Sequence, residues 1–139
     1  MSLIEQRSAF RINDSICFMV KKTSESDGYT AVTLIDSSCE HSPEADKIFP
    51  NLPATIELTV VNISASGMAF NSEEAFANDT TVLLTIRLTK NAPILRVIGN
   101  VVHTSEVGTA HFIRVHFNHI NEATKAALEE FTANALLKK

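Results

Sequence analysis

The chain has 139 residues, of which 45% are hydrophobic and 20% are charged, and its formal net charge is −4 at pH 7. This length and balance predict one compact domain with its own core, and they exclude wholesale disorder. The net negative charge argues against nonspecific binding to nucleic acid, and no apolar run approaches the ~20 residues that span a bilayer.

Alternating apolar and polar residues predict strands through most of the chain. We expect these strands over Phe10–Lys22, Tyr29–Ile35, Ala54–Asn62, Met68–Phe70, Thr81–Leu88, Ile94–His103 and Ala110–Phe117. Gly99 lies inside one of these runs, which indicates a bulge or a close approach of two backbones. Residues 37–53 are rich in turn-forming residues and predict a long surface loop.

The pattern changes to helical spacing from Asn121 to Leu137, a stretch that contains neither glycine nor proline. Asn121 is suited to cap the first turn, where the helix dipole also favours the negative charge of Glu122. Many short strands followed by one helix predict an all-β fold with a C-terminal helix, built as a small antiparallel β-barrel.

Two short motifs carry most of the functional information. Arg7 and Arg11 form an arginine pair separated by three residues, and residues 62–67 read Asn-Ile-Ser-Ala-Ser-Gly at the junction of two expected strands. In this order and strand context, the motifs resemble those of the PilZ domain family, which binds the bacterial second messenger cyclic di-GMP. The resemblance covers residues 5–137 except much of the 23–50 segment. It implies a six-stranded barrel with a segment inserted between the first strands.

The resemblance assigns ligand contacts to both arginines and to Asn62, Ser64 and Gly67. A guanidinium can pair with phosphate oxygens and also stack on a purine, whereas a lysine offers only a point charge. The Asn62 side chain can accept from a guanine N–H, and the Ser64 hydroxyl adds a compact polar contact. Gly67 permits a positive φ and a close backbone approach. Either motif alone is more often a solvated arginine pair or an ordinary hairpin turn.

We expect a single domain over residues 1–139, with an arginine-bearing arm at 1–12, an acidic insertion at 23–50 and a closing helix at 121–137. Residues 23–46 carry six acidic residues and no Lys or Arg, which leaves ten acidic against twelve basic residues, or +2, for the rest. A mildly basic body can hold a small anionic ligand. The acidic segment is expected to be solvated, with a docking face for a basic partner as a weaker alternative.

Three features depart from the family pattern. Fifty residues separate Arg11 from Asn62, and Gln6 stands where some relatives carry a further arginine, which leaves the number of bound ligands open. Arg114 stands where such domains often have glycine. It is expected on the outer face of its strand, opposite Ile113 and Val115.

The sequence therefore predicts a non-catalytic cyclic di-GMP receptor that switches a protein-interaction surface in a motility, biofilm or exopolysaccharide system. The alternative is a PilZ-like interaction module that no longer binds nucleotide. A barrel that binds RNA or oligosaccharide is disfavoured by the net charge and by the single Tyr and absent Trp. An enzyme is the least favoured class, because no catalytic set and no nucleophile motif is found.

No metal site, no nucleic-acid polymer partner and no membrane insertion are expected. His111 and His116 would point to opposite faces of a strand, so they do not form a ready pair of metal ligands. The N-terminus lacks the features of a secretory signal. Cys17 and Cys39 are too few for a disulfide framework and are expected to be free thiols in a reducing, cytoplasmic compartment.

Overall fold

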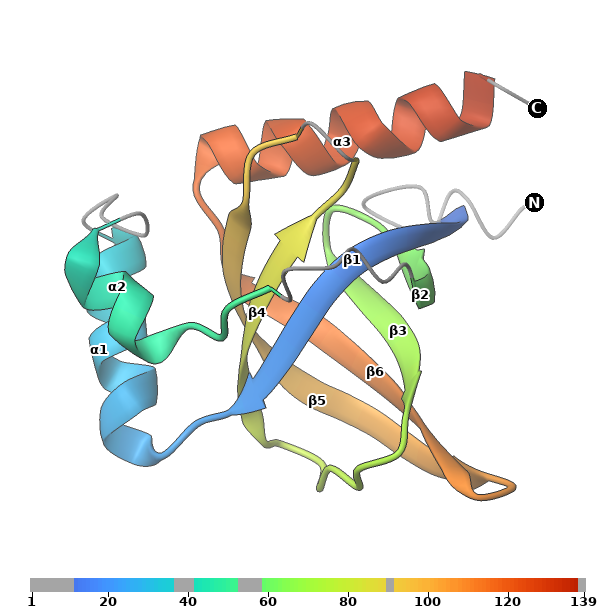
Figure 1. Cartoon of the computed structure of the whole chain (residues 1–139), viewed down its shortest axis with the longest axis horizontal. Coiled ribbons are helices and arrows are strands. Elements are labelled where there is room, and N and C mark those ends of the chain that lie inside the picture. The colour runs from blue at the N-terminus through green and yellow to red at the C-terminus, as the bar shows by residue number, and fades with distance from the viewer. Residues whose placement is uncertain (1–11, 37–41, 53–58, 90–91, 138–139) are drawn as a thin grey trace.

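Six strands close into an antiparallel barrel in the computed structural model, which describes residues 12–36, 42–52, 59–89 and 92–137 (Figure 1). In chain order the strands are β1 (Ile12–Lys22), β2 (Thr59–Ile63), β3 (Gly67–Ser72), β4 (Thr81–Arg87), β5 (Leu95–Val107) and β6 (Ala110–His119). Around the barrel they follow the order β1-β2-β3-β6-β5-β4, and every neighbouring pair is antiparallel. The expected fold class is confirmed.

The barrel interior is filled by the apolar residues that alternate along the strands. On β4, for example, Val82, Leu84 and Ile86 are fully buried in the main core. The rings of Phe18 and Phe70 meet edge to face in this core, with their centroids 5.0 Å apart. Each fully buried side chain of this size stabilises the fold by about 1.5–3 kcal/mol. Because the interior is packed, a ligand has to bind on the outer face or at the ends of the barrel.

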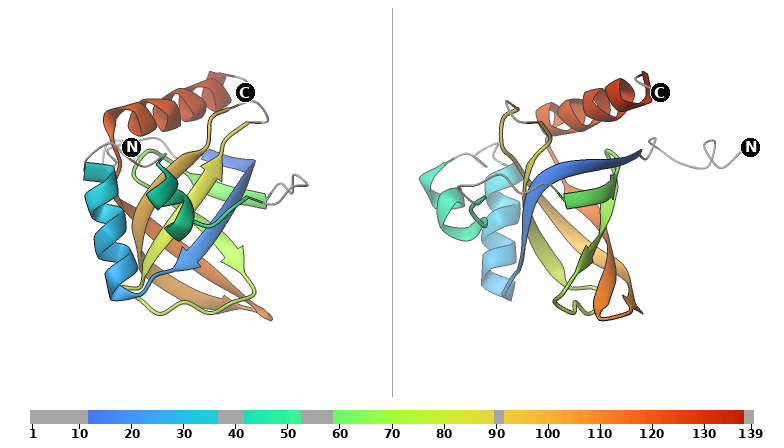
Figure 2. Two further views of the ribbon diagram at one scale, coloured as in Figure 1. Left: turned by 60° about the vertical axis from the view of Figure 1, so that its left-hand side comes forward. Right: turned by 45° about the vertical axis from the view of Figure 1, so that its right-hand side comes forward.

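Helix α3 (Glu122–Leu137) lies across one end of the barrel, as Figures 1 and 2 show. Leu128 is fully buried in the main core, and Ala127 and Phe131 pack against the same cluster. The Asn121 side-chain oxygen accepts a hydrogen bond from the Thr124 backbone N–H at 2.8 Å, which satisfies one of the free donors of the first turn. The predicted C-terminal helix and its N-cap are both confirmed.

The segment between β1 and β2 differs from the sequence prediction. Tyr29–Ile35, expected as a strand, lies within helix α1 (Glu25–Asp36). Ala31 and Ile35 are buried at helical spacing, whereas Tyr29 is 77% exposed. The Ser24 hydroxyl accepts from the Asp27 N–H at 3.3 Å and caps the helix start. Packing of one helical face therefore outweighed the strand propensity of the β-branched residues.

The predicted loop over residues 37–53 is also wrong in part, because it contains helix α2 (Pro43–Ile48). Ser42 accepts from the Ala45 N–H at 3.3 Å, and Pro43 occupies the first helical turn, where its missing N–H costs nothing. Helices α1 and α2 cover the outer face of β4 and β5 with a second core. Its buried members are Ala31, Ile35, Ala45, Phe49, Leu83 and Ile98.

Polar contacts also attach α2 to the barrel. The Arg96 guanidinium of β5 pairs with the Asp46 carboxylate at 2.5 Å and lies over the Phe49 ring, 5.7 Å from its centroid. The Lys21 ammonium of β1 donates to the Ile48 carbonyl at 3.2 Å. The inserted segment is thus tied to the barrel by charge as well as by apolar contacts.

Gly99 lies both at a register shift and at a close approach of two strands, the two features expected from the sequence. The pairing of β5 with β6 shifts register between Ile98 and Gly99. A Cβ atom at Gly99 would lie 2.5 Å from Val115 Cγ1 and 2.7 Å from the His116 carbonyl oxygen. The remaining strands agree with prediction apart from their ends, although residues 10–11 of the expected Phe10–Lys22 strand and residues 54–58 of the expected Ala54–Asn62 strand lie outside the described residues.

Candidate functional site

The Asn-Ile-Ser-Ala-Ser-Gly motif forms the turn that joins β2 to β3. Asn62 lies near the end of β2, and Gly67 begins β3. The Ser64 N–H donates to the Gly67 carbonyl at 2.9 Å, which closes the turn. The Ser66 carbonyl accepts from the Phe117 N–H at 2.9 Å and ties the turn to β6. The structure therefore brings together three of the five predicted site residues, Asn62, Ser64 and Gly67.

Ser64 is fully buried, and its hydroxyl is used inside the turn. Its Oγ accepts from the Ser66 N–H at 3.1 Å and lies 3.0 Å from the Ser66 Oγ. This arrangement fixes the direction of the turn between the strands. The ligand contact expected of Ser64 remains a prediction, and half-buried Ser66, which the sequence analysis did not single out, lies beside it.

Gly67 is required by a close approach of two backbones. It pairs with His116 of β6, and a Cβ atom at this position would overlap the Val115 carbonyl oxygen. The expected positive φ is wrong, because among the described glycines only Gly108 has one, at 63°. The motif glycine thus serves strand packing rather than an unusual backbone conformation.

Arg7 and Arg11 lie outside the described residues, but the point where their segment joins the barrel is described. Ile12 at the start of β1 pairs with Ile63, and the next pair along the strands joins residues 13 and 62. The right view of Figure 2 shows this end of β1 beside β2. Arg11 is bonded to Ile12, and Arg7 is five residues before it. Five residues span at most ~17 Å, so the segment is attached within reach of the turn.

Strand β6 borders the other side of the turn with two side chains that were not in the predicted site. Arg114 pairs with Ala69, and Ala69 pairs with Asn62. His116 pairs with Gly67. Both Arg114 and His116 are exposed on the outer face. The outward direction of Arg114 is as predicted. The sequence analysis missed its position beside the motif. The pairing register of two strands that are distant in the sequence cannot be predicted from the local residue pattern.

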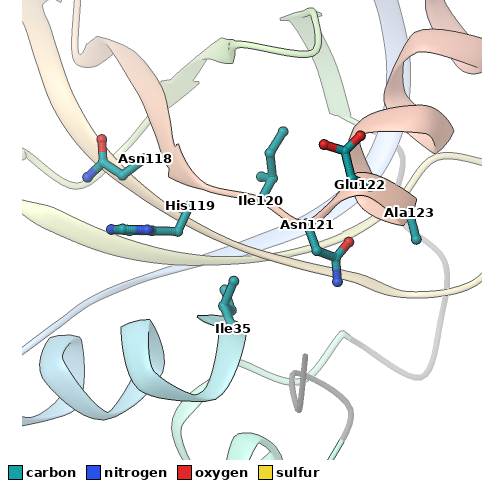
Figure 3. A pocket seen from close by; sticks show the side chains of 7 residues that line it. All are labelled: Ile35, Asn118, His119, Ile120, Asn121, Glu122 and Ala123. Atoms are coloured by element: carbon teal, nitrogen blue, oxygen red, sulfur yellow. The ribbon is translucent and has the colours of Figure 1, made fainter. Parts of the chain in front are cut away.

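A separate cavity of about 700 Å³ lies where β6 leads into α3, beside the end of α1 that carries Ile35 (Figure 3). It is lined by Ile35, Asn118, His119, Ile120, Asn121, Glu122 and Ala123, none of which belongs to the predicted site. The lining contains no Lys or Arg, and Asn121 already caps α3. For an anionic ligand, the turn bordered by Arg114 is therefore the better candidate.

The described ranges contain neither a metal-binding cluster nor a membrane-spanning helix. In these ranges no three His, Cys, Asp or Glu side chains gather closely enough to hold a metal ion. Of the helices in the described part of the chain, none combines the length and apolar character needed to cross a bilayer.

Comparison with known proteins gives one family and a set of similar structures. The family model described as PilZ domain matches residues 5–134. A protein from Xanthomonas campestris, described as a tetrameric PilZ domain assembled through a helical bundle, has a TM-score of 0.63 and 16% identity; the match covers 94% of this chain and 90% of that one. The Bacillus subtilis inhibitor of motility MotI/DgrA has a TM-score of 0.63 and 15% identity; the match covers 96% of this chain and 52% of that one. Among curated proteins the comparison found no match.

Proposed function

The chain belongs to the PilZ domain family, and on this basis we propose that it is a cytoplasmic, non-catalytic receptor for cyclic di-GMP. The observation that carries the proposal is the register of β1 on β2, which attaches the arginine-bearing segment directly beside the Asn62–Gly67 turn. The proposed ligand residues are Arg7, Arg11, Asn62, Ser64 and Gly67.

Each residue of the proposed site has a distinct part in binding. The two arginines pair with phosphate oxygens or stack on a guanine, and Asn62 accepts from a guanine N–H at the end of β2. Ser64 holds the turn in shape through its bonds to Ser66. Gly67 lets β3 approach β6 closely beside the turn.

The proposed output is a change in the surface that the protein presents to a partner. Ligand bound between the arginines and the turn would fix the N-terminal segment against the barrel and alter the side chains displayed there. We propose a partner in a motility or exopolysaccharide system. The fold shared with an inhibitor of motility supports the first of these, although that likeness is one of fold alone.

Calorimetric titration tests the proposal directly. We expect cyclic di-GMP to bind with a Kd between sub-micromolar and about 10 µM, equivalent to about −7 to −9 kcal/mol, whereas GTP and cyclic AMP bind far more weakly. No heat and no chemical-shift change at about 100 µM cyclic di-GMP, roughly ten times the weakest expected Kd, would overturn it.

One observation favours the alternative of an interaction module that has lost nucleotide binding. The Ser64 hydroxyl is fully buried and already has partners within the turn. The same titration separates the two functions, because such a module would give no heat with the dinucleotide while remaining folded.

A further inference from the structure

One row of outward-facing residues crosses four strands beside the motif turn. Asn62 of β2 pairs with Ala69 of β3, Ala69 pairs with Arg114 of β6, and Arg114 pairs with His103 of β5. The residues on either side of Ala69 and Arg114 in their strands are buried in the barrel core. The members of the row therefore point away from the core.

The surface of this row is formed by its larger side chains. Neighbouring strands lie about 4.8 Å apart, so Asn62 and Arg114 are separated by ~10 Å of backbone. Ala69, between them, ends at its Cβ atom and is only 3% exposed. Asn62 is half-buried and Arg114 is exposed, so the amide and the guanidinium face the same stretch of surface.

Among the described residues, the cross-strand partners and same-face neighbours of Arg114 include two imidazoles and no carboxylate. Its partners across the strands are Ala69 and His103, and its neighbours on the same face of β6 are Phe112 and His116. The ion pairs found among the described residues involve Lys22 and Arg96, not Arg114. An unneutralised guanidinium flanked by imidazoles on a strand surface favours an anion.

The barrel order places β1 and β6 on opposite sides of the β2–β3 pair. Strand β1, which carries the arginine segment, adjoins β2, and β6, which carries Arg114, adjoins β3. We propose that Arg114 is a further ligand-contacting residue, whose guanidinium pairs with a phosphodiester oxygen of cyclic di-GMP on the β6 side of the turn. This inference rests on the proposed function. Arg114 would contact the ligand from the β6 side, whereas Arg7 and Arg11 are proposed to contact it from the β1 side.

The test compares Arg114→Ala, Arg114→Lys and the wild-type chain by calorimetry with cyclic di-GMP. Loss of a charge-assisted contact should weaken binding about 5- to 50-fold in Arg114→Ala, and Arg114→Lys should recover part of this loss because it keeps the charge. Both variants should melt within about 2 °C of wild type, because the replaced side chain is exposed. A matched control, Lys125→Ala on the exposed face of α3, removes the same charge and should change Kd by less than about twofold.

The salt dependence distinguishes a direct anion contact from a structural role. If Arg114 meets a phosphate, Arg114→Ala should show a shallower decline of affinity with added salt than the wild-type chain. Wild-type affinity and an unchanged salt dependence in Arg114→Ala would overturn this inference and leave the proposed function standing. Absence of binding in the wild-type chain itself would overturn both.

Discussion

At the scale of single residues, the β2–β3 turn depends on two small groups with different tasks. The Ser64 hydroxyl forms hydrogen bonds with Ser66 inside the turn, and Gly67 leaves room for the backbone of β6. Neither task requires a ligand. Asn62, Arg7 and Arg11 are instead proposed to contact the ligand itself, so their substitution should act mainly on binding.

Replacing Arg7 or Arg11 by alanine should weaken cyclic di-GMP binding by ~10–100-fold, because each change removes a charged contact to the ligand. Arg7→Lys should also bind poorly, since the planar fork and the stacking surface are lost. Calorimetry gives the affinities, and thermal melting should stay near the wild-type value. A lysine variant with wild-type affinity would show that a point charge is sufficient.

Gly67→Ala should lower the free energy of unfolding by about 1–3 kcal/mol, because the added methyl overlaps the Val115 carbonyl oxygen and the backbone must move. The matched control is Gly28→Ala in α1, where the nearest atom to the added carbon is 3.5 Å away. That change should be neutral or stabilise the helix by up to ~1 kcal/mol. Urea unfolding of both variants measures the difference, and equal stabilities would contradict the close approach.

At the scale of elements, the inserted helices and the motif turn occupy opposite sides of the barrel. Helices α1 and α2 cover β4 and β5, whereas the turn joins β2 to β3. The second core should therefore contribute to stability without touching the ligand. This separation can be tested with a pair of aromatic substitutions in the inserted segment.

Phe49→Ala should cost about 3 kcal/mol or more, because the ring is 3% exposed and lies under the Arg96 guanidinium. Tyr29→Ala should be nearly neutral, since that ring is 77% exposed. Chemical denaturation measures both, and cyclic di-GMP affinity should be unchanged in each. If Phe49→Ala stayed folded but lost the ligand, the site would extend to the insertion.

Helix α1 shows why part of the fold escaped the sequence analysis. The barrel strands follow a clear alternation, as in Val82, Leu84 and Ile86 of β4, and were predicted from it. The run Tyr29–Ile35 is rich in β-branched residues and favours a strand locally. Its helical state follows from the apolar outer face of β4 and β5, where Leu83 and Ile98 need a cover.

The candidate site, like the fold, could be predicted only where the local sequence pattern is sufficient. Residues 62–67 could be recognised because the motif is contiguous in the sequence. Arg114 could be placed on an outer face by alternation alone, but not next to Asn62. That adjacency requires β6 to pair with β3 in one register out of several, and such pairing depends on the whole barrel.

At the scale of the whole molecule, charge is divided between the insertion and the rest of the chain. Six acidic residues lie within residues 23–46, and the remainder carries a net +2. The proposed arginine–phosphate contacts lie in the part of the chain with net positive charge. Because salt screens such contacts, we expect the affinity for cyclic di-GMP to fall as salt is added. Titration between low and high ionic strength measures this slope. A flat response would contradict a role for the arginines in holding phosphate.

The closed barrel also limits how a partner can recognise this protein. Among the described residues, each of the six strands has a hydrogen-bonded neighbour on both sides, so no strand is free along the whole of one side. Proteins with open sheets can recruit an extended peptide as an additional strand, through backbone hydrogen bonds that are largely indifferent to sequence. The closed order of the strands leaves little room for such addition, which favours recognition through side chains, loops or helices. A change in which side chains are displayed around the β2–β3 turn is therefore a signal that such a partner can detect.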